Sequence, residues 1–269
     1  MFNVWLFLIT LVGAAAAHLF SNMINDLWDY KSGTDTAAKE AVDAVSTNSG
    51  FDEPGMERPQ VCGHHLGTFC AGCRLRHRAG DLFRHLGVCF RSPRRADRLL
   101  LRGASAEVRV PGKGYSEIAI LLSFGVLPVM GAYYVQTSHL DLRALLLSLP
   151  IGLLTTLILF NHHFLHWQAD RQAGKRTLVV VWGEKRALAF SRFLLFLAAV
   201  MLVISVIAGA LPVYGLLALP AMLPLYQVYG RLKPQNSSHA YLPLMGASVK
   251  SAQLSGLIMI VCLVIQGLI

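Results

Sequence analysis

The stretch NMINDLWDYKSGTD, residues 22–35, sets acidic and amide side chains directly behind an apolar segment. Asn22, Asp26 and Asp29 are spaced at i, i+4 and i+7, so a helix would carry all three on one face. Carboxylates at the edge of a membrane segment are costly, and they usually face the interior of a helix bundle and serve its function. The other interpretation of these residues is a solvated helix end. We predict that the shared face binds a ligand.

The stretch NHHFLHWQADRQAGKRT, residues 161–177, has the same character. His162, His166 and Asp170 are spaced at i, i+4 and i+8 and again form one stripe on a helix. The basic side chains that follow are Arg171, Lys175 and Arg176. The segment is neither a nucleotide-binding phosphate loop nor a zinc-protease helix, because it lacks the glycine, the serine or threonine and the glutamate that those motifs require.

Together the two stretches predict a site for a hard metal ion and an anion. Carboxylate and amide oxygens suit Mg²⁺, which usually keeps several waters and is shared with the phosphates of a substrate. Lysine and arginine add fixed positive charge that matches a diphosphate. Because both stretches follow apolar segments, we expect the rest of the substrate to be lipid-like. A polyprenyl diphosphate combines these properties.

The elements that must position these residues are membrane helices. The chain is 54% hydrophobic and only 14% charged, which is too apolar for an ordinary soluble domain. The first of its apolar windows lacks the basic start and the cleavage site of a signal peptide, so we interpret it as a retained span. We predict an all-α integral membrane bundle, embedded in lipid. Six windows approach the ~20 residues that a helix needs to cross a bilayer: Phe2–Ser21, Ile118–Gln136, Ala144–Asn161, Phe193–Leu211, Val213–Tyr229 and Ser251–Ile269.

Lysine and arginine in the connecting segments predict the orientation of these spans. They gather after the first window, after the third and before the last, whereas the connections on the opposite side hold Arg143 alone. Connections rich in these residues stay on the cytoplasmic side. The two polar stretches are therefore predicted to share the cytoplasmic face of a bacterial or archaeal membrane.

A segment in the middle of the chain, residues 58–114, is foreign in composition. Between Val61 and Val110 lie ten of the seventeen arginines, no lysine and four of the five cysteines. This window supplies +7 of the net charge of +9. The basicity of the chain is therefore local and does not indicate a partner such as nucleic acid.

Three interpretations of this foreign segment stay open. Cys70 and Cys73 with nearby histidines would suit zinc, and a basic surface loop or amphipathic piece would bind anionic lipid or nucleic acid. A reading-frame slip would instead have replaced two membrane spans. We favour the slip, because the segment begins and ends on the predicted cytoplasmic side, so an even number of crossings belongs there. Its arginines would each cost about 2.5–3.5 kcal/mol at the centre of a span.

Both polar stretches resemble motifs of a known family. The first resembles the first aspartate-rich motif of the UbiA superfamily of membrane prenyltransferases, and its ending is most like the 1,4-dihydroxy-2-naphthoate polyprenyltransferase branch. That likeness rests on Asn22, Asn25, Asp26, Asp29, Gly33 and Asp35. The second stretch resembles the tail of the second motif through Asp170, Arg171, Gly174, Lys175, Arg176, Thr177, Leu178, Val180 and Gly183. The resemblance covers residues 1–57 and 114–269.

The resemblance implies a single domain over residues 1–269, with the family fold of nine transmembrane helices around a central cavity. Six of the nine are visible, two would fit in the foreign segment, and the first would precede Met1. It also implies transfer of a polyprenyl group from an allylic diphosphate to an aromatic quinone precursor, with Mg²⁺ as cofactor. Two other classes stay open, namely a truncated, frameshifted and inactive remnant of such an enzyme, and a small-solute transporter.

Residue roles follow from the same resemblance. Asp26, Asp29 and Asp170 would hold Mg²⁺, and these three with Lys175 would be catalytic. The family usually has an aspartate where this chain has His166, and imidazole is a less natural ligand of Mg²⁺ than carboxylate. The histidines are therefore expected to contact the diphosphate or the aromatic acceptor. The predicted substrate-binding residues are Asn22, Asn25, Lys31, Asp35, His162, His166, Arg171 and Arg176.

Overall fold

The computed structural model describes residues 2–15, 19, 115–172 and 174–269. Every regular element within these ranges is a helix. The predicted all-α integral membrane bundle is confirmed. The first polar stretch, residues 22–35, and the foreign segment, residues 58–114, lie outside the described residues. Four described helices are long and apolar enough to cross a membrane: Glu117–Thr137, Leu142–Gln172, Glu184–Ile207 and Ser238–Leu268.

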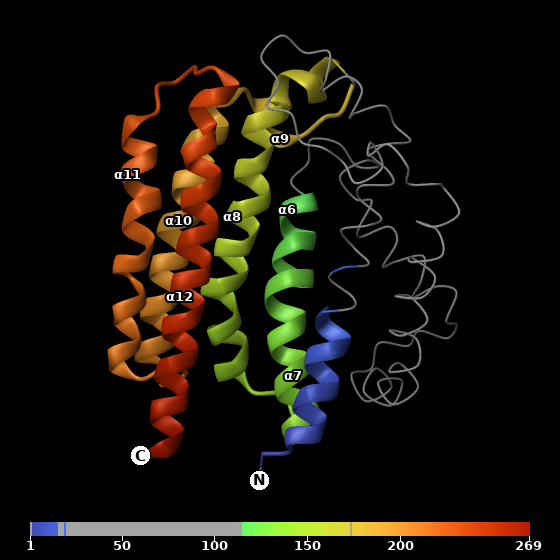
Figure 1. Cartoon of the computed structure of the whole chain (residues 1–269), viewed down its shortest axis with the longest axis vertical. Coiled ribbons are helices and arrows are strands. Elements are labelled where there is room, and N and C mark those ends of the chain that lie inside the picture. Colours follow the sequence, from blue (N-terminus) through green and yellow to red (C-terminus); the bar gives the residue numbers. More distant parts are fainter. Residues whose placement is uncertain (1, 16–18, 20–114, 173) are drawn as a thin grey trace, which may run out of the picture.

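The long helices run alternately up and down, so the chain reverses at each end of the bundle (Figure 1). The end of α8 and the starts of α10 and α12 consequently lie at the same end. A π-helical turn, η1, joins α6 to α7 without a break, and η2, η3 and η4 are 3-10 helices. The elements are a helix over Val4–Ala15, then α6 (Tyr115–Ile120), η1 (Leu121–Val126), α7 (Leu127–Thr137), α8 (Leu142–Gln172), α9 (Leu178–Trp182), α10 (Glu184–Ile207), η2 (Val213–Ala218), η3 (Pro220–Met222), α11 (Leu223–Arg231), η4 (Ser238–Tyr241) and α12 (Leu242–Leu268).

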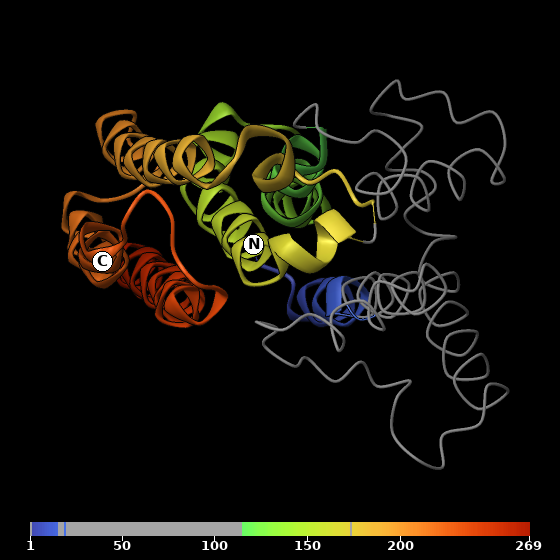
Figure 2. The same ribbon diagram turned by 90° about the horizontal axis from the view of Figure 1, so that it is seen from above.

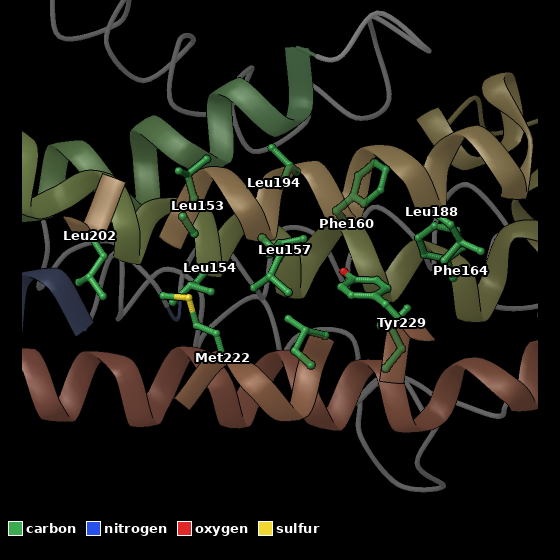
Figure 3. Packing of buried hydrophobic residues seen from close by; sticks show 14 of the residues in the cluster. Leu153, Leu154, Leu157, Phe160, Phe164, Leu188, Leu194, Leu202, Met222 and Tyr229 are labelled. Atoms are coloured by element: carbon green, nitrogen blue, oxygen red, sulfur yellow. The ribbon is translucent and has the colours of Figure 1, made fainter. Parts of the chain in front are cut away.

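Helix α8 is the centre of the described bundle. It contacts η1, α10 and α12, and Figure 2 shows it between the α6–α7 helix and the other long helices. Leu154, Leu157, Phe160 and Phe164 of α8 are fully buried. They pack with leucines of α10 and with Met222 and Tyr229 in one apolar cluster (Figure 3). Because this packing surrounds α8, the polar end of the helix is held on a rigid element.

Two of the predicted spans have the wrong starting residue. Helix α10 begins at Glu184 rather than Phe193, and α12 begins at Leu242 rather than Ser251. The lysines and arginines near these starts ended the apolar windows. Lysine and arginine are nonetheless good helix formers. Their long side chains can place the charged group in water, so a helix that carries them can continue out of the hydrocarbon. Both helices therefore extend past the apolar layer at the end where α8 carries its polar residues.

The predicted span Val213–Tyr229 is wrong in form, because three short helices, η2, η3 and α11, replace one long helix. Pro220 starts η3 and Pro224 lies in the first turn of α11. Proline has no backbone N–H, so it is tolerated in the first turn of a helix and interrupts one elsewhere. The segment therefore restarts at each proline.

Candidate active site

The second polar stretch occupies the last turns of α8. His162 and His166 lie side by side, with ring centroids 4.9 Å apart and ring planes inclined by 52°. Both histidines are half-buried, whereas Asp170, one turn further on, is only 2% exposed. The i, i+4 spacing predicted that His162 and His166 lie on one face of a helix, and this prediction is confirmed. It follows that the end of α8 presents imidazole and carboxylate groups on successive turns.

A tight turn follows Asp170 and reverses the chain. Gly174 has a left-handed backbone with φ of 72°, a conformation that glycine adopts without the steric penalty of a side chain. The N–H of Gly174 donates to the carbonyl of Arg171 at 3.3 Å, and the N–H of Lys175 donates to the carbonyl of Asp170 at 2.8 Å. The turn thus fixes the backbone of Lys175 beside that of Asp170. The side chains of Arg171 and Arg176 are exposed, and that of Lys175 is half-buried.

The short helix α9 anchors the end of this turn. Thr177 caps the helix, and its hydroxyl accepts a hydrogen bond from the N–H of Val180 at 3.4 Å. Leu178 and Val179 are 2% and 0% exposed, so their burial holds α9 against the bundle. Gly183, with φ of 76°, then starts α10. The basic turn is therefore a compact connection with one apolar side and one polar side.

A buried polar cluster lies directly before His162. The side-chain amide of Asn161 donates to the hydroxyls of Tyr229 and Ser248, both at 2.8 Å, and the hydroxyl of Ser191 donates to its carbonyl oxygen at 2.5 Å. These four residues come from α8, α10, α11 and α12, and each is at most 1% exposed. The cluster fixes the rotation of α8 about its own axis, and with it the direction of the histidines.

Sequence reasoning missed this cluster, which comprises Asn161, Ser191, Tyr229 and Ser248. The available signal was a single asparagine at the end of an apolar window. Serine and tyrosine in spans are common, because they bond to carbonyls of their own helix or lie at the membrane surface. Spacing within one helix cannot reveal partners on three others.

A cavity of about 450 Å³ opens beside the last turns of α8. Its lining includes Trp167, Gln168, Arg171 and Gln172. Trp167 also packs against the apolar core, as expected for a residue near the membrane interface. The exposed guanidinium of Arg171 thus borders open space next to the buried Asp170.

The sequence model of the UbiA prenyltransferase family matches residues 113–265, which is more than half of the chain. This chain belongs to the UbiA prenyltransferase family. The match contains the whole second polar stretch and the cluster around Asn161. It begins at Lys113, where the foreign segment ends.

Several curated relatives of this UbiA chain extend the comparison. The chain is 29% identical over 199 residues to UbiA prenyltransferase domain-containing protein 1 of Xenopus tropicalis, with 71% of this chain and 54% of that protein covered. The human protein of the same name is 28% identical over 197 residues, with 73% and 56% covered. The 1,4-dihydroxy-2-naphthoate octaprenyltransferase of Haemophilus influenzae is 25% identical over 217 residues, with 78% and 68% covered. The chain spans about half the length of the first two relatives.

The metal site predicted for this UbiA chain falls only partly on described residues. Asp26 and Asp29 lie outside them, and so do Asn22, Asn25, Lys31 and Asp35. Within the described ranges, no three histidine, cysteine, aspartate or glutamate side chains are grouped to hold a metal ion. Asp170 fits the predicted Mg²⁺ in kind, because its carboxylate supplies hard oxygen donors. The three-aspartate site stays a prediction.

Proposed function

We propose that this UbiA chain transfers a polyprenyl group from an allylic diphosphate to an aromatic quinone precursor of the 1,4-dihydroxy-2-naphthoate type. The observation that carries the proposal is the buried Asp170 joined by backbone hydrogen bonding to a basic turn, at the end of a membrane helix. The Haemophilus influenzae relative, named 1,4-dihydroxy-2-naphthoate octaprenyltransferase, supports the acceptor class. We place this site on the cytoplasmic side of the membrane.

The basic side chains serve the leaving group. Breaking the bond between the prenyl carbon and the diphosphate oxygen leaves negative charge on the diphosphate, and fixed cations lower the energy of that state. Lys175, Arg176 and Arg171 lie within the turn that Gly174 closes. Lys175 is the best placed of the three, because its backbone is hydrogen-bonded to that of Asp170.

The cofactor in this proposal is Mg²⁺, held by Asp26, Asp29 and Asp170. When bound, it would neutralise part of the charge of the diphosphate. Asp170 suits this role because its carboxylate supplies the hard oxygen donors that Mg²⁺ prefers, and because it lies at the end of α8 directly before the basic turn.

The paired histidines are assigned to substrate. His162 and His166 are half-buried on the turns that lead to Asp170, so a ligand bound at Asp170 would lie within reach of this face. Imidazole rings donate hydrogen bonds to phosphate oxygens and stack on aromatic rings. We assign them to the diphosphate or to the aromatic acceptor.

The apolar bundle protects the reaction from water. Departure of the diphosphate leaves an allylic carbocation that water would capture, and a site without water favours attack by the electron-rich ring instead. The new carbon–carbon bond forms as the ring carbon supplies an electron pair, and that carbon then loses its substituent, a carboxylate as CO₂ in the naphthoate branch. The fully buried residues beneath the histidines, Phe160 and Phe164 among them, close this layer to water.

The experiment is direct. Membranes carrying the full chain are incubated with labelled octaprenyl diphosphate and 1,4-dihydroxy-2-naphthoate, with Mg²⁺ or with excess chelator. We expect labelled prenyl naphthoquinol in the first case and none in the second. Membranes that carry the Asp170→Asn variant test the role of Asp170 and should form no product. Product that is equally abundant in the variant would overturn the assignment of Asp170.

A second candidate is an inactive remnant of such an enzyme, favoured by the extent of the family match. That match begins at Lys113, within the last two residues of the foreign segment. The discriminating observation is the coding DNA across residues 58–114. Two apolar spans in another reading frame would support the remnant, and their absence together with product in the membrane assay would exclude it.

A further inference from the structure

A second polar network lies at the same end of the bundle as Asp170 and links Glu184 to the loop between α11 and η4. The carboxylate of Glu184, at the first position of α10, accepts a hydrogen bond from the backbone N–H of Asn236 at 3.0 Å. The same carboxylate oxygen accepts a short hydrogen bond from the hydroxyl of Tyr241. The side-chain amide of Asn236 donates to that hydroxyl at 3.0 Å. The three residues therefore form a closed triangle of hydrogen bonds.

Two corners of this triangle, Tyr241 and Asn236, are fixed by further contacts. Tyr241 is completely buried, and its ring packs on Phe164 of α8 with centroids 5.0 Å apart. The side chain of Asn236 also bonds to the N–H and the carbonyl of Lys233, at 3.0 and 2.7 Å. The network thus joins the loop after α11 and the start of α10 to the turn of α8 just before His166.

The triangle is the downstream anchor of the basic turn. Residues 173–183 connect α8 to α10, and the upstream end of this connection is fixed where Lys175 bonds to the backbone of Asp170. Their downstream end runs through Gly183 directly into Glu184. Because this connection is only eleven residues long and includes α9, a shift of Glu184 would be transmitted to Lys175 and Arg176.

We propose that Glu184 and Tyr241 are positioning residues for the diphosphate. Through their hydrogen bond they hold the basic turn at the distance from Asp170 at which its cations meet a bound diphosphate. The inference rests on the proposed function for the identity of the ligand. The two residues lie outside the predicted catalytic set, and Glu184 is joined to the basic turn through the chain at Gly183.

The two donors to Glu184 make it possible to test whether this residue acts through its hydrogen bonds or through its charge. Both donors to Glu184 are neutral, an amide N–H and a phenol, so a glutamine carbonyl can accept the same two hydrogen bonds. Glu184→Gln should therefore keep the position of the turn, whereas Glu184→Ala should release it. A role of Glu184 as a charged group would make these two variants equally defective.

The test uses the full chain in membranes and the substitution Tyr241→Phe. This change removes the hydroxyl and keeps the ring that packs on Phe164. We expect the KM for octaprenyl diphosphate and the inhibition constant of inorganic diphosphate each to rise about threefold to tenfold, the range that the loss of one ordinary intramolecular hydrogen bond sets. The KM for the aromatic acceptor should not change. Tyr226→Phe, at an exposed tyrosine of α11, is the matched control and should leave all three constants unchanged.

Direct binding of inorganic diphosphate to the solubilised chain, measured by calorimetry with Mg²⁺, separates this inference from the proposed function. Weaker binding in Tyr241→Phe supports the inference even if the chain forms no prenylated product. Equal binding in the wild-type chain and the variant overturns it, as does a wild-type chain that binds no diphosphate. A structural defect alone would raise the acceptor KM to the same extent and would not be spared in Glu184→Gln.

Discussion

Gly125 of η1 and Gly152 of α8 bring two membrane helices into backbone contact. A Cβ atom added to Gly125 would lie 2.4 Å from the Cα of Gly152, and one added to Gly152 would lie 3.0 Å from the Cα of Gly125. Small residues at such crossings allow the close packing that holds membrane helices together. The contact falls where the α6–α7 helix contains its π-helical turn. It therefore fixes the height of that helix against α8.

We predict that Gly125→Ala destabilises the bundle. The added methyl group meets backbone rather than a movable side chain, so the helices must separate, at a cost of about 1–3 kcal/mol. Thermal unfolding of the solubilised protein, followed by circular dichroism, measures the loss. Gly131→Ala on the same continuous helix meets open space, so it is the control and should unfold at the wild-type temperature or above. Equal melting temperatures for the two variants would contradict the proposed contact.

A second prediction concerns the cluster around Asn161. Asn161→Leu removes the amide that donates to the buried hydroxyls of Tyr229 and Ser248, together with the carbonyl oxygen that accepts from Ser191, and the loss of such buried hydrogen bonds costs about 1–3 kcal/mol. We expect a lower free energy of unfolding in detergent titrations. Thr155→Val is the comparison, because the Thr155 hydroxyl bonds only within its own helix, to the carbonyl of Ile151. If both changes are equally mild, the cluster does not hold the helices together.

The third prediction concerns Lys175. Lys175→Ala should lower kcat for prenyl transfer by about 10²- to 10³-fold, since it removes a cation that offsets the charge of the departing diphosphate. Lys175→Arg keeps the charge and should recover part of the rate. Steady-state assays with saturating octaprenyl diphosphate supply both values. A rate that Lys175→Ala leaves intact would assign the leaving-group role to another cation.

The fourth prediction concerns His166, which stands where the family motif usually has an aspartate. Asp is a harder ligand than imidazole, and His166 lies one turn from Asp170. We expect His166→Asp to lower the Mg²⁺ concentration that gives half-maximal rate by about threefold or more. Titration of the prenyl-transfer rate with Mg²⁺ provides the readout, with His239→Asp, at an exposed position of η4, as the control. An unchanged titration would mean that residue 166 does not face the metal.

The features that depend on residues close together in the sequence, such as the long helices and the histidine pair, could be predicted. Apolar runs located the long helices, because the cost of exposing backbone and burying charge in lipid acts residue by residue. The close approach of the His162 and His166 rings follows from helix geometry alone. The starts of α10 at Glu184 and of α12 at Leu242 could not be predicted in this way. Both helices continue into water, where the sequence is polar and an apolar window no longer detects a helix.

Contacts between helices could not be predicted in the same way. The triangle of Glu184, Asn236 and Tyr241 joins residues up to 57 positions apart, and none of them stands out within its own segment. The prolines of the η2 to α11 region are visible in the sequence, yet hydropathy treats them as neutral and merges three helices into one span. Such features depend on tertiary packing, and the hydropathy of one segment carries no information about its partners on other helices.

The length of α8 sets the depth at which the proposed reaction takes place. Its 31 residues extend for roughly 46 Å at about 1.5 Å per residue, well beyond the ~30 Å of hydrocarbon in a bilayer. The turns that carry Asp170 therefore reach the layer of lipid headgroups. A diphosphate bound there stays level with the phosphates of the surrounding lipids while its tail remains in the leaflet. The inorganic product of the proposed reaction can then diffuse into the water at that face, and the prenylated ring stays behind in the membrane.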